Sequence, residues 1–115
     1  MSAPADCLFC RIIRKEIPAQ IVSETAECIA FRDTSPQAPT HILVVPREHV
    51  PSLNQAADAA MVGRLALLAA QIAKSEGLAE RGYRTVINTN AEAGQTVFHL
   101  HLHLLGGRKM KWPPG

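Results

Sequence analysis

The stretch of sequence that decides the fold is His99-Leu100-His101-Leu102-His103-Leu104-Leu105, close to the end of a 115-residue chain. Histidine and leucine alternate strictly in it, and alternate side chains of a β-strand point to the same face. We therefore predict a strand over residues 97–105 whose three imidazoles face one way, about 6.8 Å apart, while its leucines pack against a helix. In a helix, the same histidines would spread around the axis and would form no site.

Three interpretations of this row of imidazoles stay open from the residues alone. The histidines can be incidental on a strand, although three at a period of two in a chain with only five histidines argue against this. They can bind a metal, although a zinc site usually draws its ligands from more than one element. They can also catalyse a reaction, because imidazole titrates near neutrality, is nucleophilic when neutral and transfers protons.

The remaining chain carries short strand patterns around one long helical pattern. One helical face is predicted from apolar residues that recur at Met61, Leu65, Leu68 and Ile72. We predict Asn54 as the N-cap of this helix and Gly77 as its end. Strands are predicted over residues 21–23, 28–32, 41–45 and 85–89, and a short helix over residues 8–15. Strands in runs with one main helix predict an α+β fold with a largely antiparallel sheet.

Composition and charge limit the classes of function. The chain is 47% hydrophobic and 19% charged, with a net charge of +2, which predicts one globular domain over residues 1–115 with a flexible end at residues 1–5. Positive and negative charges are interspersed, so the sequence shows no basic patch of the kind that binds nucleic acids or membranes. No segment resembles a targeting or membrane-spanning signal. An odd count of three cysteines argues against a secreted disulfide framework. We therefore expect a cytoplasmic protein.

The alternating stretch resembles the histidine-triad signature, His-φ-His-φ-His-φ-φ, in which φ is apolar. Its flanks resemble the histidine triad nucleotide-binding protein branch of the histidine triad (HIT) superfamily, known for purine nucleoside phosphoramidase activity. The match covers nearly the whole chain, from about Asp6 to Gly115. The flanks that carry it are Phe9, Ile12–Ala19, Asp33, Ser35–His41, Gly106–Arg108 and Trp112–Gly115.

The resemblance implies both a fold and a reaction. The implied protomer has a five-stranded antiparallel sheet, one long helix and a short N-terminal helix, and two protomers pair into a ten-stranded sheet. The implied reaction is hydrolysis of purine nucleoside 5′-phosphoramidates, of the type in which AMP is joined to an amine or to lysine, and of aminoacyl adenylates. It proceeds through a covalent nucleotidyl-histidine and requires no metal for its chemistry. The implied partners are an AMP- or GMP-type nucleotide and a second copy of the chain.

The resemblance also implies roles for the four catalytic candidates. His101 matches the nucleophile, and a backbone carbonyl should hold its other ring nitrogen and so fix its tautomer. His103 should contact phosphate oxygens and assist the leaving group, and His41 should join a hydrogen-bond relay with His103. His99 lies nearby, with the least defined catalytic role.

The nucleotide contacts carry over in the same way. Asp33 resembles the carboxylate that accepts both ribose hydroxyls, and Thr96 stands where the family has a serine at the phosphate. The residues implied to contact the nucleotide are Asp33, Asn88, Gln95, Thr96, Phe9, Ile12, Phe31 and Trp112. Trp112 would do so from the tail at residues 106–115, which the resemblance places at the active site of the partner protomer. For the aromatic and aliphatic members, and for Phe31 above all, plain core packing is the competing interpretation.

A second candidate site begins at Cys7-Leu8-Phe9-Cys10. A CxxC pair alone indicates metal binding, redox chemistry or neither. Some bacterial members of the resembled family bind a structural zinc ion through such a pair and two histidines. The matching set here is Cys7, Cys10, His49 and His99, a Cys2His2 combination that suits tetrahedral zinc. The third cysteine, Cys28, lies in a strand pattern and is predicted to be a small buried apolar residue.

Two other functions remain alternatives to the phosphoramidate hydrolase. One is a purine nucleotide-binding interaction or regulatory protein whose catalysis is incidental. The other is a dinucleoside polyphosphate hydrolase or nucleotidyltransferase, against which the Trp-Pro-Pro-Gly ending and the single short domain argue.

Overall fold

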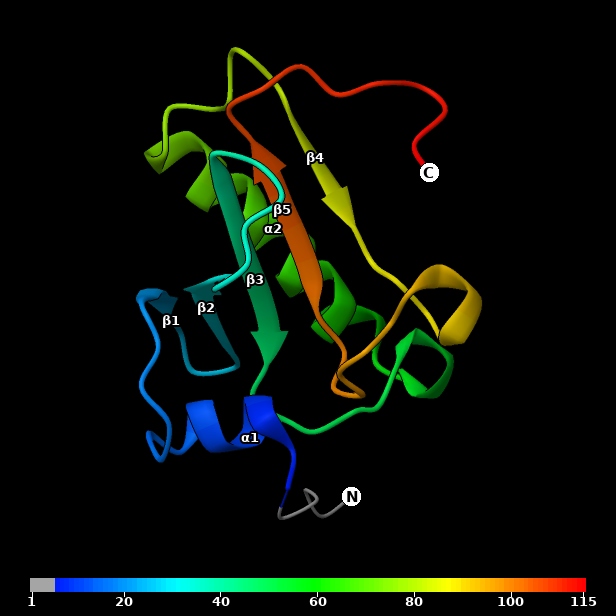
Figure 1. The fold of residues 1–115 in the computed structure, drawn as a ribbon. Coiled ribbons are helices and arrows are strands. Elements are labelled where there is room, and N and C mark those ends of the chain that lie inside the picture. The colour runs from blue at the N-terminus through cyan, green and yellow to red at the C-terminus, as the bar shows by residue number, and fades with distance from the viewer. Residues whose placement is uncertain (1–5) are drawn as a thin grey trace.

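The computed structural model of the chain describes residues 6–115, so the flexible end predicted over residues 1–5 lies outside the described residues. No helix in the described part of the chain is both long and apolar enough to span a bilayer. One-turn 3-10 helices occupy Leu53–Gln55 and Ala91–Ala93. The other elements, shown in Figure 1, are α1 (Leu8–Ile13), β1 (Ile21–Glu24), β2 (Cys28–Arg32), β3 (Thr40–Pro46), α2 (Ala59–Ser75), β4 (Tyr83–Val86) and β5 (Leu102–Gly106).

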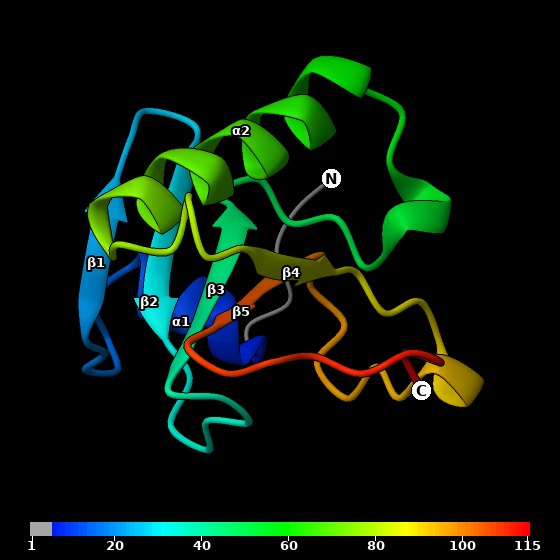
Figure 2. The ribbon, with the colours of Figure 1, turned by 90° about the horizontal axis from the view of Figure 1, so that it is seen from above.

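The strands form one antiparallel sheet in the order β1-β2-β3-β5-β4. The predicted α+β class, with a five-stranded antiparallel sheet, one long helix and one short helix, is therefore confirmed. The long helix α2 lies across one face of the sheet, as Figure 2 shows. The short helix α1 packs against the other face, through Phe9 and Ile12.

Alternation along the central strands explains the two layers. In β3, Ile42 and Val44 pack in the cluster on the α2 side, whereas Leu43 and Val45 pack with α1. The leucines of the histidine stretch join the α2 side together with all four apolar helix residues predicted from the sequence. These residues are Leu100, Leu102, Leu104, Met61, Leu65, Leu68 and Ile72. Cys28 is also buried there, as predicted.

The last two strands differ from the sequence prediction in their bounds. β5 begins at Leu102 instead of residue 97, and its pairing with β3 ends where Leu102 lies opposite Val44. Two residues later β3 ends at Pro46, which has no N–H with which to continue a ladder. β4 pairs with β5 from Tyr83, opposite Gly106, to Val86, opposite His103, so the strand predicted over residues 85–89 is displaced to Tyr83–Val86.

The start of α2 was also predicted wrongly. Asn54 belongs to the preceding 3-10 helix. The N-cap is Asp58, whose carboxylate accepts a hydrogen bond from the backbone N–H of Ala60 at 3.0 Å. The helix ends at Ser75, and Gly77 follows with a φ of 76°, which is the left-handed conformation that glycine adopts readily after a helix.

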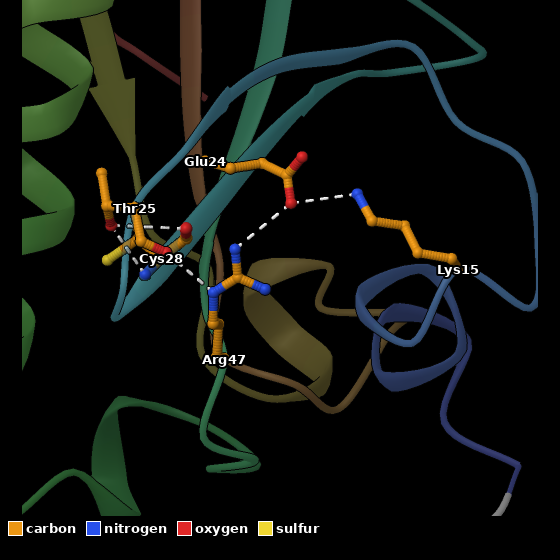
Figure 3. Close-up of polar contacts among 5 residues, drawn as sticks. All are labelled: Lys15, Glu24, Thr25, Cys28 and Arg47. Atoms are coloured by element: carbon orange, nitrogen blue, oxygen red, sulfur yellow. Dashed lines mark hydrogen bonds and ion pairs between the residues drawn. The ribbon is translucent and has the colours of Figure 1, made fainter.

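A small polar network ties the β1–β2 hairpin to its neighbours (Figure 3). One carboxylate oxygen of Glu24 accepts from Nζ of Lys15 at 2.9 Å and from Nη2 of Arg47 at 3.2 Å. Nε of Arg47 donates to the carbonyl of Thr25, whose hydroxyl accepts the backbone N–H of Cys28. The charged side chains of this network are partly exposed to solvent, so we expect it to position the hairpin but to contribute little to the free energy of folding.

Candidate active site

Three of the predicted catalytic histidines meet where β3 and β5 lie side by side. His41 is near the start of β3, His103 is the second residue of β5, and His101 immediately precedes β5. The ring centroids of His101 and His103 are 4.9 Å apart, and those of His103 and His41 are 5.2 Å apart. The topology therefore brings together side chains that are 60 residues apart in the chain.

Hydrogen bonds define the tautomers of His41 and His103. The backbone N–H of Gln37 donates to Nδ1 of His41 at 3.0 Å, so the proton of neutral His41 is on Nε2. That nitrogen lies 2.9 Å from Nδ1 of His103 and donates to it. The proton of neutral His103 must then be on its Nε2, and the predicted contact between the two histidines is present.

The tautomer of His101 is fixed separately. Its Nδ1 lies 2.8 Å from the backbone carbonyl oxygen of His99, which can only accept. Nδ1 is therefore the protonated nitrogen, and Nε2 carries the lone pair. This is the carbonyl contact expected from the sequence, although the carbonyl lies in a bend before β5 instead of in a strand.

Burial keeps these imidazoles neutral at pH 7. Burial, together with the neighbouring His101 and His41, lowers the pKa of His103 to about 4, although the Asp33 carboxylate opposes this shift. Burial also lowers the pKa of His101 and of His41, although the Asp33 carboxylate opposes both shifts. One carboxylate oxygen of Asp33 lies 3.6 Å from Nε2 of His41.

A cavity of about 330 Å³ opens beside the histidines, which is the size range of small-molecule sites. Its polar lining includes Asp33, Thr96, His101 and His103. Its apolar lining includes the predicted Phe9, Ile12 and Phe31, together with Leu8, Ile17, Leu43 and Val97. Phe9 meets Phe31 edge-on, with centroids 5.4 Å apart, and meets His101 in the same way at 5.0 Å. The cavity therefore combines aromatic and aliphatic walls with polar side chains, and Phe9 directly contacts His101.

The remaining predicted nucleotide contacts lie outside the cavity lining. Asn88 is in the segment that follows β4. The Gln95 amide bonds three backbone groups, those of Asn90, Pro51 and Val97, and so holds its loop together. Trp112 is 82% exposed and lies 6.0 Å from the guanidinium carbon of Arg84.

His99 is turned toward the second candidate site. One ligand atom each from Cys7, Cys10, His49 and His99 lies within 4.8 Å of the others. Nε2 of His99 donates to the carbonyl of Pro46 at 2.8 Å, so its Nδ1 carries a lone pair, 3.5 Å from both sulfur atoms. The row of three histidines is thus divided between two sites.

The donor set of this cluster fits a tetrahedral zinc ion. Two sulfurs and two imidazole nitrogens converge, and three of the four residues are buried. Burial, with Cys7 beside it, raises the pKa of the Cys10 thiol to about 11. Such a thiol ionises near pH 7 only when a cation compensates its charge.

Sequence reasoning missed two kinds of contributor to the active site. Leu43 could have been found, because alternation in the strand pattern at residues 41–45 places it opposite Ile42 and on the face that carries α1. The backbone N–H of Gln37 could not, because a main-chain group leaves no signal in the residue types.

The chain belongs to the HIT domain family, which matches residues 14–110. It is 56% identical over 112 residues to an uncharacterized HIT-like protein of Synechococcus elongatus, a match that covers 96% of this chain and 97% of that protein. A HIT family hydrolase from Legionella pneumophila superposes with a TM-score of 0.93 at 49% identity, covering 96% of this chain and 100% of the other. A histidine triad nucleotide-binding protein from Candida albicans superposes with a TM-score of 0.83 at 30% identity, covering 94% and 83%. These similarities support the general assignment of the chain as a nucleotide hydrolase or transferase.

Proposed function

We propose that the protein hydrolyses purine nucleoside 5′-phosphoramidates and aminoacyl adenylates through a nucleotidyl-histidine on His101. The observation that carries the proposal is the state of His101. Its Nδ1 is committed to a carbonyl, and its unprotonated Nε2 belongs to a ring that lines the cavity. A neutral imidazole so oriented is a nucleophile at pH 7.

In the first step, Nε2 of His101 attacks the phosphorus, and the bond between phosphorus and the amine nitrogen breaks. The departing amine must take up a proton, and Nε2–H of His103 is the donor in the cavity lining. The proton on Nε2 of His41 can then shift toward Nδ1 of His103. The negative charge left on this pair is balanced by the nucleotidylated His101, which is now an imidazolium.

In the second step, water returns a proton to His103, and its oxygen attacks the phosphorus. The bond to Nε2 of His101 breaks, the nucleoside monophosphate is released, and all three imidazoles are neutral again. Throughout, Asp33 is proposed to receive the ribose hydroxyls, since a carboxylate offers two acceptor oxygens. Phe9, Ile12 and Phe31 would enclose the base.

Turnover of adenosine 5′-phosphoramidate by the wild type and by His101→Ala tests this function. We expect kcat to fall by more than about 1000-fold while the circular dichroism spectrum is kept. Unchanged turnover in a folded variant would contradict the proposal. Faster turnover of a dinucleoside polyphosphate by the wild type would instead favour the other catalytic branch. Purine nucleotide binding with negligible turnover would favour the interaction protein.

We further propose that Cys7, Cys10, His49 and His99 hold zinc. When bound, zinc supplies a cross-link between α1, the segment after β3 and the segment before β5. We expect the purified wild type to contain one zinc ion per chain by elemental mass spectrometry, and Cys10→Ser to contain far less. Cys28→Ala is the matched control, because it removes a thiol outside the cluster and should keep the metal. Equal zinc in Cys10→Ser and the wild type would contradict this assignment.

A further inference from the structure

His99 takes part in both sites through different atoms. Its ring belongs to the cysteine-histidine cluster, through Nδ1, while its backbone carbonyl accepts the Nδ1 proton of His101 at 2.8 Å. We propose that His99 is a positioning residue that makes the alignment of the nucleophile depend on occupancy of the Cys7–Cys10–His49–His99 site. Only the expected effect on turnover rests on the proposed function, whereas the effect of the bound metal on His101 does not.

The backbone around His101 gives the first argument. β5 begins at Leu102, so no strand pairing holds His99, Leu100 or His101. The bonds that fix this segment run instead to the last residue of β3 and to the chain that follows it. The ring of His99 donates to the carbonyl of Pro46, and the N–H of Leu100 donates to the carbonyl of Val50 at 2.7 Å. The orientation of the His101 ring thus depends on a backbone segment, residues 99–101, that has no strand pairing.

The cluster is the second anchor of that segment. His49 precedes Val50, and its Nδ1 lies 3.1 Å from Nδ1 of His99 and 3.3 Å from the Cys10 sulfur. Since Nδ1 of His99 carries a lone pair, this contact at 3.1 Å requires either a proton on Nδ1 of His49 or a cation between the two nitrogens. A cation bound by the four ligands would take the place of that proton, hold His49 and His99 together, and so fix the carbonyl of His99 that His101 contacts.

Phe9 provides a third link between the sites. It lies between Cys7 and Cys10, and its ring contacts the rings of both His99 and His101, with centroids 5.9 Å and 5.0 Å away. α1 has only six residues, too few for a helix that is stable on its own. Anchoring both cysteines therefore holds Phe9 as well, so the cavity wall and the nucleophile depend on the same cluster.

Nitrogen-15 NMR of the histidine rings, with Zn²⁺ added or removed by a chelator, tests the inference without any substrate. With Zn²⁺ we expect His101 to show Nδ1 in the protonated range and Nε2 in the unprotonated range. Without Zn²⁺ we expect both signals to move toward intermediate values, because both tautomers become populated. In the same samples, kcat for the phosphoramidate should fall by roughly 10- to 100-fold.

Variants separate positioning from a general effect on folding. His49→Ala should reproduce the metal-free His101 signals, His49→Cys should restore zinc and the wild-type signals, and Cys28→Ala should change neither. Metal-free protein that stays folded with unchanged His101 signals would overturn the inference. Global unfolding on metal removal would also overturn it, because the cluster would then hold the whole fold. If the NMR shifts appear but turnover is absent in every sample, the proposed function fails while the coupling stands.

Discussion

His103 stands between two other imidazoles, and this position decides which of its nitrogens carries the proton. His41 donates to its Nδ1, and His41 is itself oriented by the backbone N–H of Gln37. Hydrogen bonds therefore run in one direction, from the backbone N–H of Gln37 through His41 to His103, which lines the cavity. The family resemblance could predict that these histidines meet, but not the direction of each hydrogen bond.

The lowered pKa of His103 makes the stability of the protein depend on pH. Its pKa moves from 6.5 to about 4 on folding, so between these pH values the imidazole is protonated in the unfolded chain and neutral in the folded protein. The contribution of His103 to the free energy of unfolding is therefore fully present above pH 6.5 and is lost as the pH falls toward 4. We expect the free energy of unfolding of the wild type, measured relative to His103→Asn, to fall across this range. Denaturant titrations at several pH values measure it, and a difference independent of pH would contradict the assignment.

At the scale of elements, the alternating stretch shows what a sequence pattern can and cannot predict. Alternation correctly predicted that the leucines face α2, because that result needs only the side-chain period. It could not predict where β5 begins, because the strand stops for lack of a partner at Pro46, and pairing is a property of two segments. His99 consequently lies in a bend and joins the cysteine cluster, the set of four residues that the family resemblance implied.

The corrected start of α2 gives a prediction with a matched control. Asp58 caps the helix through the N–H of Ala60, so Asp58→Ala should lower the free energy of unfolding by about 1 kcal/mol. Asn54→Ala, at the position favoured by the sequence, should change it by less than about 0.5 kcal/mol. Denaturant unfolding of both variants measures the difference. A larger loss from Asn54→Ala would contradict the observed cap.

At the scale of the whole molecule, the sheet ends at β4 on one side, and the tail at residues 106–115 leaves the sheet beside it (Figure 1). Trp112, in that tail, is exposed and lies outside the cavity lining of its own chain. A sequence read as one chain cannot assign such a residue. The predicted dimer, in which the tail completes the site of the partner, would give it a role.

Mixing two defective variants tests that dimer. If Trp112 serves the partner's site, a mixed dimer of His101→Ala and Trp112→Ala has one site with both an intact His101 and an intact Trp112. We expect the mixture, after exchange of protomers, to exceed the summed turnover of the two variants alone. Sedimentation analysis should give twice the 12.5 kDa chain mass. A monomeric mass, or turnover equal to the sum, would contradict the shared site.

The central claim is that Nε2 of His101 forms a covalent bond to phosphorus. Acid-free rapid quenching after mixing with an adenosine 5′-phosphoramidate, followed by peptide mass spectrometry, tests it most directly. We expect an adenylyl group on the peptide that contains His101, formed within the first turnover and absent in His101→Asn. Steady turnover with no adduct on any histidine, or an adduct that persists in His101→Asn, would contradict the account.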